Sequence, residues 1–258
     1  MTGQEFIATL SPVAQRLMSI YQFKKEKPIA LHITDNKERP CFMVYNDPNC
    51  YPVFINPDAL GPKAEVAFMH QFCHCVQMEE KFPFVKSLTP DDKDTVELAE
   101  AINSIVLDMY VNHVLKDNGY PKDEKELEEL YTELHFRFRY FTENKMPITS
   151  YDKKYAEFIY ASQIARVYFE YDTKKARALQ KEVAAFSKET KAYAGMFINI
   201  VKAYSYDTHI GCHYIFDHLL DNMKLKNILT IDHREEEDAE NETAAADNVT
   251  SLPKDGES

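Results

Sequence analysis

The stretch EVAFMHQFCHCVQMEE, residues 65–80, carries two histidines four positions apart within a run of apolar residues. Nothing in it breaks a helix, so the sequence predicts a helix over residues 63–80. Residues four apart lie on one helical face, with Cβ atoms about 5–6 Å apart. His70 and His74 can therefore offer two imidazoles to one zinc ion, each at about 2.0–2.1 Å.

The segments before this helix differ in pattern from those after it. Residues 4–24 are expected to form one or two helices, with Ser11-Pro12 as an N-terminal capping signal. Three runs rich in β-branched and aromatic residues then predict strands at 28–35, 41–47 and 51–60. Helical patterns follow at 92–117, 123–142, 151–171, 173–188, 190–204 and 207–228, with breaks at KFPF, DNGYP and NKMPITS.

These patterns predict an α+β fold, a small N-terminal sheet beside a mainly helical body. We expect three parts: a core over residues 1–121, a helical extension over 122–231 and a tail over 232–258. The tail is acidic and has almost no large apolar residues, which is the composition of a disordered segment.

Composition and charge exclude several classes of function. The net charge of −12 argues against nucleic acid or an anionic membrane as partner, because both require a basic surface. Only 6 glycines are present, and no Gly-rich nucleotide loop is found. No apolar run reaches the roughly 20 residues of a membrane span, and the N-terminus does not resemble a signal peptide. Five scattered cysteines without a CxxC pair indicate reduced thiols, so we expect a cytoplasmic protein.

A third metal ligand is expected on the second long helix. Glu97, Ser104 and Asp108 lie on a common stripe within residues 96–115, and Asn112 lies one further turn along. A carboxylate from this helix would complete three protein ligands and leave one position for water, as in catalytic zinc sites.

The two helices together resemble a known family. His70-x-x-x-His74 followed by LDMYVNHVLKDNGYP is similar to zincin-type bacterial metallopeptidases, in which HExxH precedes a helix reading approximately AxDxx(I/V)N. The resemblance covers residues 50–121 and implies that residues 1–121 form a zincin-like core. It further implies zinc held by His70, His74 and Asp108, a peptide or protein substrate, and a partner ATPase. The chain departs from the family at Leu107, where a small residue is usual, and it lacks the downstream von Willebrand-type domain.

Gln71 stands where HExxH enzymes carry the glutamate that takes a proton from zinc-bound water. An amide can hold that water by hydrogen bonding but cannot accept its proton, and loss of a general base typically costs about 10²–10⁴-fold in rate. Three explanations stay open: a natural pseudo-peptidase, a silenced copy of an active parent, or rescue by another carboxylate. The nominal candidates for rescue are Glu65, Glu79, Glu80 and Glu97.

Several further residues have both a functional and a structural interpretation. Cys73 could share the face of His70, although buried thiols more often act as small apolar side chains, and Cys75 points elsewhere. Tyr120 could place a phenol near an oxyanion. His209, His213 and Asp217 lie on one helical stripe and could form a second metal site. His113 is expected to face away from Asp108.

Two functions from different classes follow from the sequence. The first is a zinc-binding metallopeptidase-like protein whose peptide-bond hydrolysis is impaired by Gln71. The second is a non-catalytic helical interaction protein, such as a phage or mobile-element accessory protein, whose histidines are structural.

Overall fold

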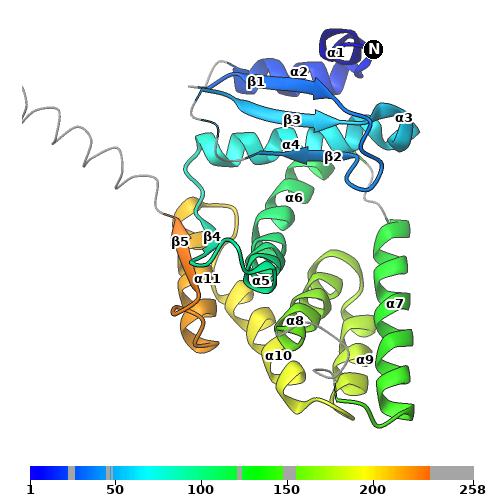
Figure 1. Cartoon of the computed structure of the whole chain (residues 1–258), viewed down its shortest axis with the longest axis vertical. Helices are drawn as coiled ribbons and strands as arrows, with labels where there is room; N and C mark the ends of the chain where they lie inside the picture. The colour runs from blue at the N-terminus through cyan, green and yellow to red at the C-terminus, as the bar shows by residue number, and fades with distance from the viewer. Residues whose placement is uncertain (23–26, 45–46, 48, 121–123, 148–154, 233–258) are drawn as a thin grey trace, which may run out of the picture.

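The computed structural model describes residues 1–22, 27–44, 47, 49–120, 124–147 and 155–232. A small sheet with its helices lies at one end of the molecule, and a bundle of helices lies at the other (Figure 1). The α+β fold class expected from the sequence is therefore confirmed. Among the described residues, none of the helices combines the length and the apolar character that a bilayer-crossing segment needs.

The N-terminal sheet has three strands in the order β1-β3-β2. The central strand β3 (Tyr51–Ile55) runs parallel to β1 (Ile29–Ile33) and antiparallel to β2 (Cys41–Met43). Alternate side chains of β3 enter the core, and Tyr51, Val53 and Ile55 are at most 3% exposed.

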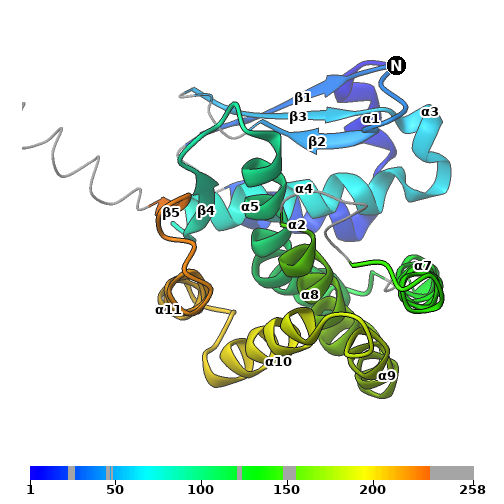
Figure 2. The same ribbon diagram turned by 60° about the horizontal axis from the view of Figure 1, so that its bottom comes forward.

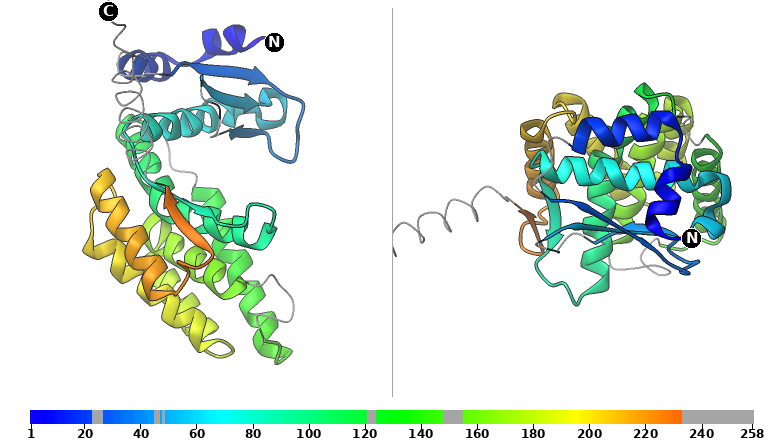
Figure 3. Two further views of the ribbon diagram at one scale, coloured as in Figure 1. Left: turned by 60° about the vertical axis from the view of Figure 1, so that its left-hand side comes forward. Right: turned by 90° about the horizontal axis from the view of Figure 1, so that it is seen from above.

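Three helices pack with this sheet into a first hydrophobic cluster: α1 (Gly3–Thr9), α2 (Pro12–Gln22) and α4 (Ala64–Glu79), the last preceded by the short α3 (Pro57–Leu60). Figure 3 shows α2 and α4 running alongside each other across one side of the sheet. The side chain of Ser11 accepts a hydrogen bond from the Ala14 backbone N–H at 3.2 Å, as its predicted capping role requires.

A single continuous helical run joins the two ends of the molecule. It consists of α5 (Lys93–Asn103), a π-helical turn (Ser104–Asp108) and α6 (Met109–Asp117). Ile105 and Val106 belong to a second hydrophobic cluster, whereas Val111 and Leu115 belong to the first. Asp108 therefore lies where the run passes from one core to the other.

The second cluster is formed mainly by the C-terminal helices. These are α7 (Glu124–Glu143), α8 (Ala156–Arg166) with a π-helical extension (Val167–Tyr171), α9 (Thr173–Val183), α10 (Lys188–Ala203) and α11 (His209–Asn222). Figure 2 shows α8, α9 and α10 together at the bottom of the view, with α7 on one side and α11 on the other. Phe138, Phe197 and Phe216 are fully buried in this core.

A second, two-stranded sheet was not expected from the sequence. The strand β4 (Phe84–Ser87) pairs antiparallel with β5 (Leu229–Asp232), although we expected only a break at 81–84 and a helix that continued to residue 228. The helix instead ends at Asn222, and Lys224 adopts a positive φ of 56°. The strand is short and its partner is distant in the sequence, so no local pattern marks it.

The two clusters are interleaved along the chain. Residues 82–109 pack with the C-terminal helices, while Val111, Leu115 and Tyr120 return to the first cluster. The division into residues 1–121 and 122–231 stays a prediction. Of the expected tail, Asp232 ends β5, and residues 233–258 lie outside the described residues.

Candidate metal centre

The two histidines lie on one face of α4, as their spacing predicts. His74 is buried, with 8% of the residue exposed, and His70 is half-buried. Their Nε2 atoms are 3.1 Å apart, and the two rings meet edge to face with centroids 4.7 Å apart.

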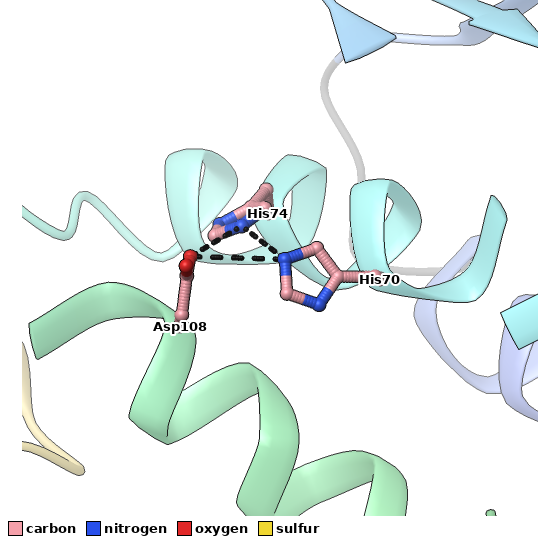
Figure 4. A group of neighbouring side chains, drawn as sticks. All are labelled: His70, His74 and Asp108. Atoms are coloured by element: carbon pink, nitrogen blue, oxygen red, sulfur yellow. Dashed lines mark hydrogen bonds and ion pairs between the residues drawn. The ribbon is translucent and has the colours of Figure 1, made fainter. Parts of the chain in front are cut away.

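Asp108 approaches this pair from the π-helical turn opposite. Its Oδ1 lies 3.1 Å from His74 Nε2 and 3.7 Å from His70 Nε2 (Figure 4). Within the part of the chain that the structure describes, these three residues form a group whose ligand atoms all lie within 4.8 Å of one another. The structure thus brings together the three residues predicted to be metal ligands.

The spacing of the three atoms fits a tetrahedral ion. Two ligands bound at about 2.0–2.1 Å with a tetrahedral angle between them lie about 3.3 Å apart. The three separations here, 3.1, 3.1 and 3.7 Å, bracket that value. Two imidazoles and one carboxylate are also a donor set that zinc accepts, and they leave a fourth position for another ligand.

The carboxyl of Asp108 is held in its anionic form. Burial alone would raise the pKa of Asp108, but hydrogen bonds and charge interactions with His70 and His74 hold that pKa well below its usual range. The carboxylate is therefore ready to bind a cation at neutral pH.

One residue in contact with the site was not singled out from the sequence. Gln77, 2% exposed, places its Oε1 2.8 Å from Nδ1 of His74 and donates from Nε2 to the Leu107 carbonyl at 3.1 Å. The available signal was its position three residues after His74, which puts the two side chains on one helical face.

A partly buried polar network adjoins the ligand helix one turn after Asp108. Asn112 donates from Nδ2 to Oε1 of Glu170 at 3.2 Å, and Arg166 Nε contacts Oε2 of Glu170 at 3.1 Å. Glu170 is 6% exposed and lies in the second π-helical segment. Arg166 also pairs with Glu126 on α7 at 3.0 Å. Asn112, expected near the metal, thus connects the ligand helix to α7 and α8.

Charges around Arg166 favour its cationic form. Burial alone would lower the pKa of Arg166, but the carboxylates of Glu170, Glu126 and Asp108 outweigh burial and raise that pKa. Asp108 and Glu170 each lie in a π-helical segment. Such segments often occur at functional sites.

Tyr120 and Glu65, two residues considered for catalysis, bind each other instead. The Tyr120 hydroxyl donates to Oε1 of Glu65 at 2.9 Å. The backbone N–H and hydroxyl of Ser11 also donate to this carboxylate, at 2.7 and 2.6 Å. The phenol and the carboxylate thus form a structural link in the first core.

The other carboxylates considered as a replacement base also lie outside the metal group. Glu79 accepts a hydrogen bond from the Tyr51 hydroxyl at 2.5 Å, and Tyr110 donates to Glu80 at 3.4 Å. Neither these residues nor Glu97 belong to the metal-ligating group found within the described ranges.

The second histidine pair does not assemble a comparable site. His209 is exposed, and Asp217 forms an ion pair with Lys226 at 2.9 Å. In the described residues, no metal-ligating group contains His209, His213 or Asp217. His113, expected to face away from Asp108, is 58% exposed and pairs with Asp117 at 3.3 Å.

The two cysteines beside His74 are buried in the first hydrophobic cluster. Cys73 is 3% exposed and Cys75 is fully buried, with its Sγ 3.0 Å from Sδ of Met43. This placement agrees with small apolar side chains rather than zinc ligands. Gln71 follows His70 directly on α4 and is half-buried.

Comparison of the chain with protein-family models, curated proteins and solved structures finds no match.

Proposed function

We propose that this protein binds zinc through His70, His74 and Asp108 and is a zincin-like metallopeptidase-type protein whose hydrolytic step is impaired by Gln71. The observation that supports the proposal is the convergence of two imidazole nitrogens and a carboxylate oxygen at 3.1–3.7 Å, the spacing of ligands around one tetrahedral ion. Side chains from two separate helices thus place three ligand atoms around one point.

The chain's own residues define what the site can do. His70, His74 and Asp108 hold the ion and leave one coordination position, where bound zinc would polarise a carbonyl and acidify a water molecule. Gln71 can orient that water by a hydrogen bond, but its amide cannot take up the proton. Peptide binding with slow or absent hydrolysis is the expected behaviour.

Zinc titration tests the metal site directly. The chelator-treated protein is titrated with zinc, and bound metal is counted after dialysis for the wild type, His74→Ala and His113→Ala. We expect one zinc per chain in the wild type and in His113→Ala, because His113 is an exposed histidine on α6 outside the ligand group. We expect none in His74→Ala. A wild type without bound zinc would support the rival interpretation, a helical interaction protein with structural histidines.

A reversal at position 71 tests the hydrolase assignment. Gln71→Glu supplies the missing carboxylate, so we expect it to raise cleavage of a peptide library by about 10²-fold or more over the wild type. Both proteins should bind zinc equally, since residue 71 is not a ligand. Unchanged inactivity of Gln71→Glu with zinc bound would contradict the peptidase assignment and leave a zinc-dependent binding protein.

A further inference from the structure

We propose that Gln77 is a positioning residue that fixes which nitrogen of His74 faces the metal and couples that histidine to the turn carrying Asp108. The inference deepens the proposed zinc site and rests on it. It is carried by two hydrogen bonds of one buried amide, to His74 and to the Leu107 carbonyl.

The orientation of the Gln77 amide follows from its partners. A backbone carbonyl only accepts hydrogen bonds, so the atom that meets the Leu107 oxygen at 3.1 Å must be the amide nitrogen. The amide oxygen then faces His74 Nδ1 at 2.8 Å. An amide oxygen also only accepts, so Nδ1 of His74 must carry the proton.

This proton position determines what Nε2 can do. A neutral imidazole has one N–H, so with Nδ1 protonated the Nε2 atom presents a lone pair. That lone pair faces Asp108 Oδ1 at 3.1 Å, and a carboxylate oxygen donates nothing in return. In neutral His74 the two atoms repel each other unless a cation lies between them. That cation is either a proton, which gives the charged imidazole that hydrogen-bonds Asp108, or a metal ion. Gln77 thereby leaves Nε2 of neutral His74 free to bind a metal ion.

The second hydrogen bond extends this effect to the third ligand. Leu107 directly precedes Asp108 within the π-helical turn, and Gln77 is 2% exposed. The buried amide therefore ties α4 to the turn that presents the carboxylate. Hydrogen-bonding partners of metal-bound histidines typically contribute about 10–100-fold to metal affinity.

Two substitutions at Gln77 separate the hydrogen bonds. Gln77→Met keeps a similar size and removes both bonds, whereas Gln77→Glu keeps an acceptor for Nδ1 and loses the amide donor. Gln180→Met is the matched control, because it makes the same replacement on α9, outside the metal-ligating group. Circular dichroism and thermal unfolding would show that each variant is folded.

The first readout is the His74 tautomer in the metal-free protein, from histidine ¹⁵N chemical shifts at pH about 8.5, well above the usual histidine pKa of about 6.5. We expect the Nδ1-protonated form in the wild type, Gln180→Met and Gln77→Glu, and a mixture in Gln77→Met. A wild-type His74 that is protonated at Nε2 and not at Nδ1 overturns the inference, whether or not any variant folds.

The second readout is the zinc dissociation constant, measured by competition with a chelator. We expect Gln77→Met to bind about 10–100-fold more weakly than the wild type and Gln180→Met to bind equally well. Equal affinity of Gln77→Met and the wild type overturns the inference but leaves the zinc site intact. A wild type that binds no zinc overturns both.

Discussion

Gly211 shows how strongly one position can depend on its surroundings. It lies in the first turn of α11, and a Cβ atom built on it would lie 1.7 Å from the carbonyl oxygen of Ser205 and 2.9 Å from Oγ1 of Thr208. The oxygen of Ser205 belongs to the backbone and cannot rotate away. The glycine in HIGCH therefore permits a close approach of the loop between α10 and α11.

We expect Gly211→Ala to lower the free energy of unfolding by at least about 2 kcal/mol, because relief of the clash requires a backbone shift. Gly195→Ala on α10 is the control. A Cβ there meets nothing within 4 Å, and alanine stabilises a helix over glycine by about 0.5–1 kcal/mol. Urea denaturation of both variants checks the pair. If both variants changed the free energy of unfolding equally, the close contact with Ser205 would not be what excludes a side chain at position 211.

The residues of the candidate site differ in how far the sequence could predict them. His70 and His74 lie on one helix, so their spacing alone fixes their relation, and the family resemblance indicated Asp108. Glu170 and Arg166 could not be linked to Asn112, because that contact joins two helices that are distant in the sequence. Periodicity describes one helix at a time and does not specify which helices meet.

At the level of elements, the Glu65 carboxylate joins α4 to two other segments. It accepts hydrogen bonds from Ser11, at the start of α2, and from Tyr120, which follows α6. Burial raises the pKa of Glu65, but these hydrogen bonds outweigh it and hold the pKa below its ordinary value of 4.5. The ionised carboxylate is thus bound more strongly in the folded protein than the neutral acid.

Glu65→Gln should therefore destabilise the protein at neutral pH by about 1–2 kcal/mol, since an amide replaces a charged acceptor of several bonds. Folding lowers the pKa of Glu65, so the stabilisation by its carboxylate is fully present above pH 4.5, the pKa in the unfolded chain. The stabilisation disappears as the pH falls through the lower pKa of the folded protein. Urea titrations at several pH values measure the difference between the two proteins. A difference that grows toward acid pH would contradict this assignment.

The Arg166–Glu170 pair connects the ligand helix, α7 and α8. Removing one partner of a buried ion pair leaves an uncompensated charge, so we expect Arg166→Met to lower the free energy of unfolding by about 3 kcal/mol. The double variant Arg166→Met/Glu170→Met should recover part of that loss. A double-mutant cycle from urea denaturation measures the coupling, and strictly additive effects would show that the two residues act independently.

Sequence patterns predicted the helices better than the strands. Helices of the bundle are long and amphipathic, so a period of 3.6 residues marks them over several turns. The strand β4 has only four residues and is held in place by contacts with distant segments. It pairs with β5, and the Asn103 side chain forms hydrogen bonds with both the N–H and the carbonyl of Val85 at 2.8 Å. These partners come from elsewhere in the chain. The sequence pattern of residues 92–117 predicted one regular α-helix and did not indicate the π-helical turn within it.

At the scale of the whole molecule, the proposed zinc ion would join the two hydrophobic cores. His70 and His74 come from a helix of the first core, and Asp108 lies where the α5–α6 run passes between the cores. Bound metal should therefore oppose separation of the two ends of the molecule as well as local unfolding.

At a free zinc concentration about 100 times the dissociation constant, zinc binding should raise the free energy of unfolding by about 2.7 kcal/mol. We expect the melting temperature to fall on addition of a chelator and to recover when zinc is restored. Asp108→Asn should remove most of this response, because the amide is a poorer ligand than a carboxylate. Differential scanning calorimetry measures the shift, and an equal zinc response in Asp108→Asn would exclude Asp108 as a ligand.

The pairing of β4 with β5 sets an order on events during protein synthesis. The strand β4 leaves the ribosome early but cannot complete its sheet until β5 has emerged, after every helix of the bundle. Among the residues that the structure describes, the first core has no buried member beyond Tyr120, so it can assemble while the remainder is still being translated. A nascent chain halted before residue 229 would thus carry a finished N-terminal core beside an open bundle, the state in which chaperones would encounter it.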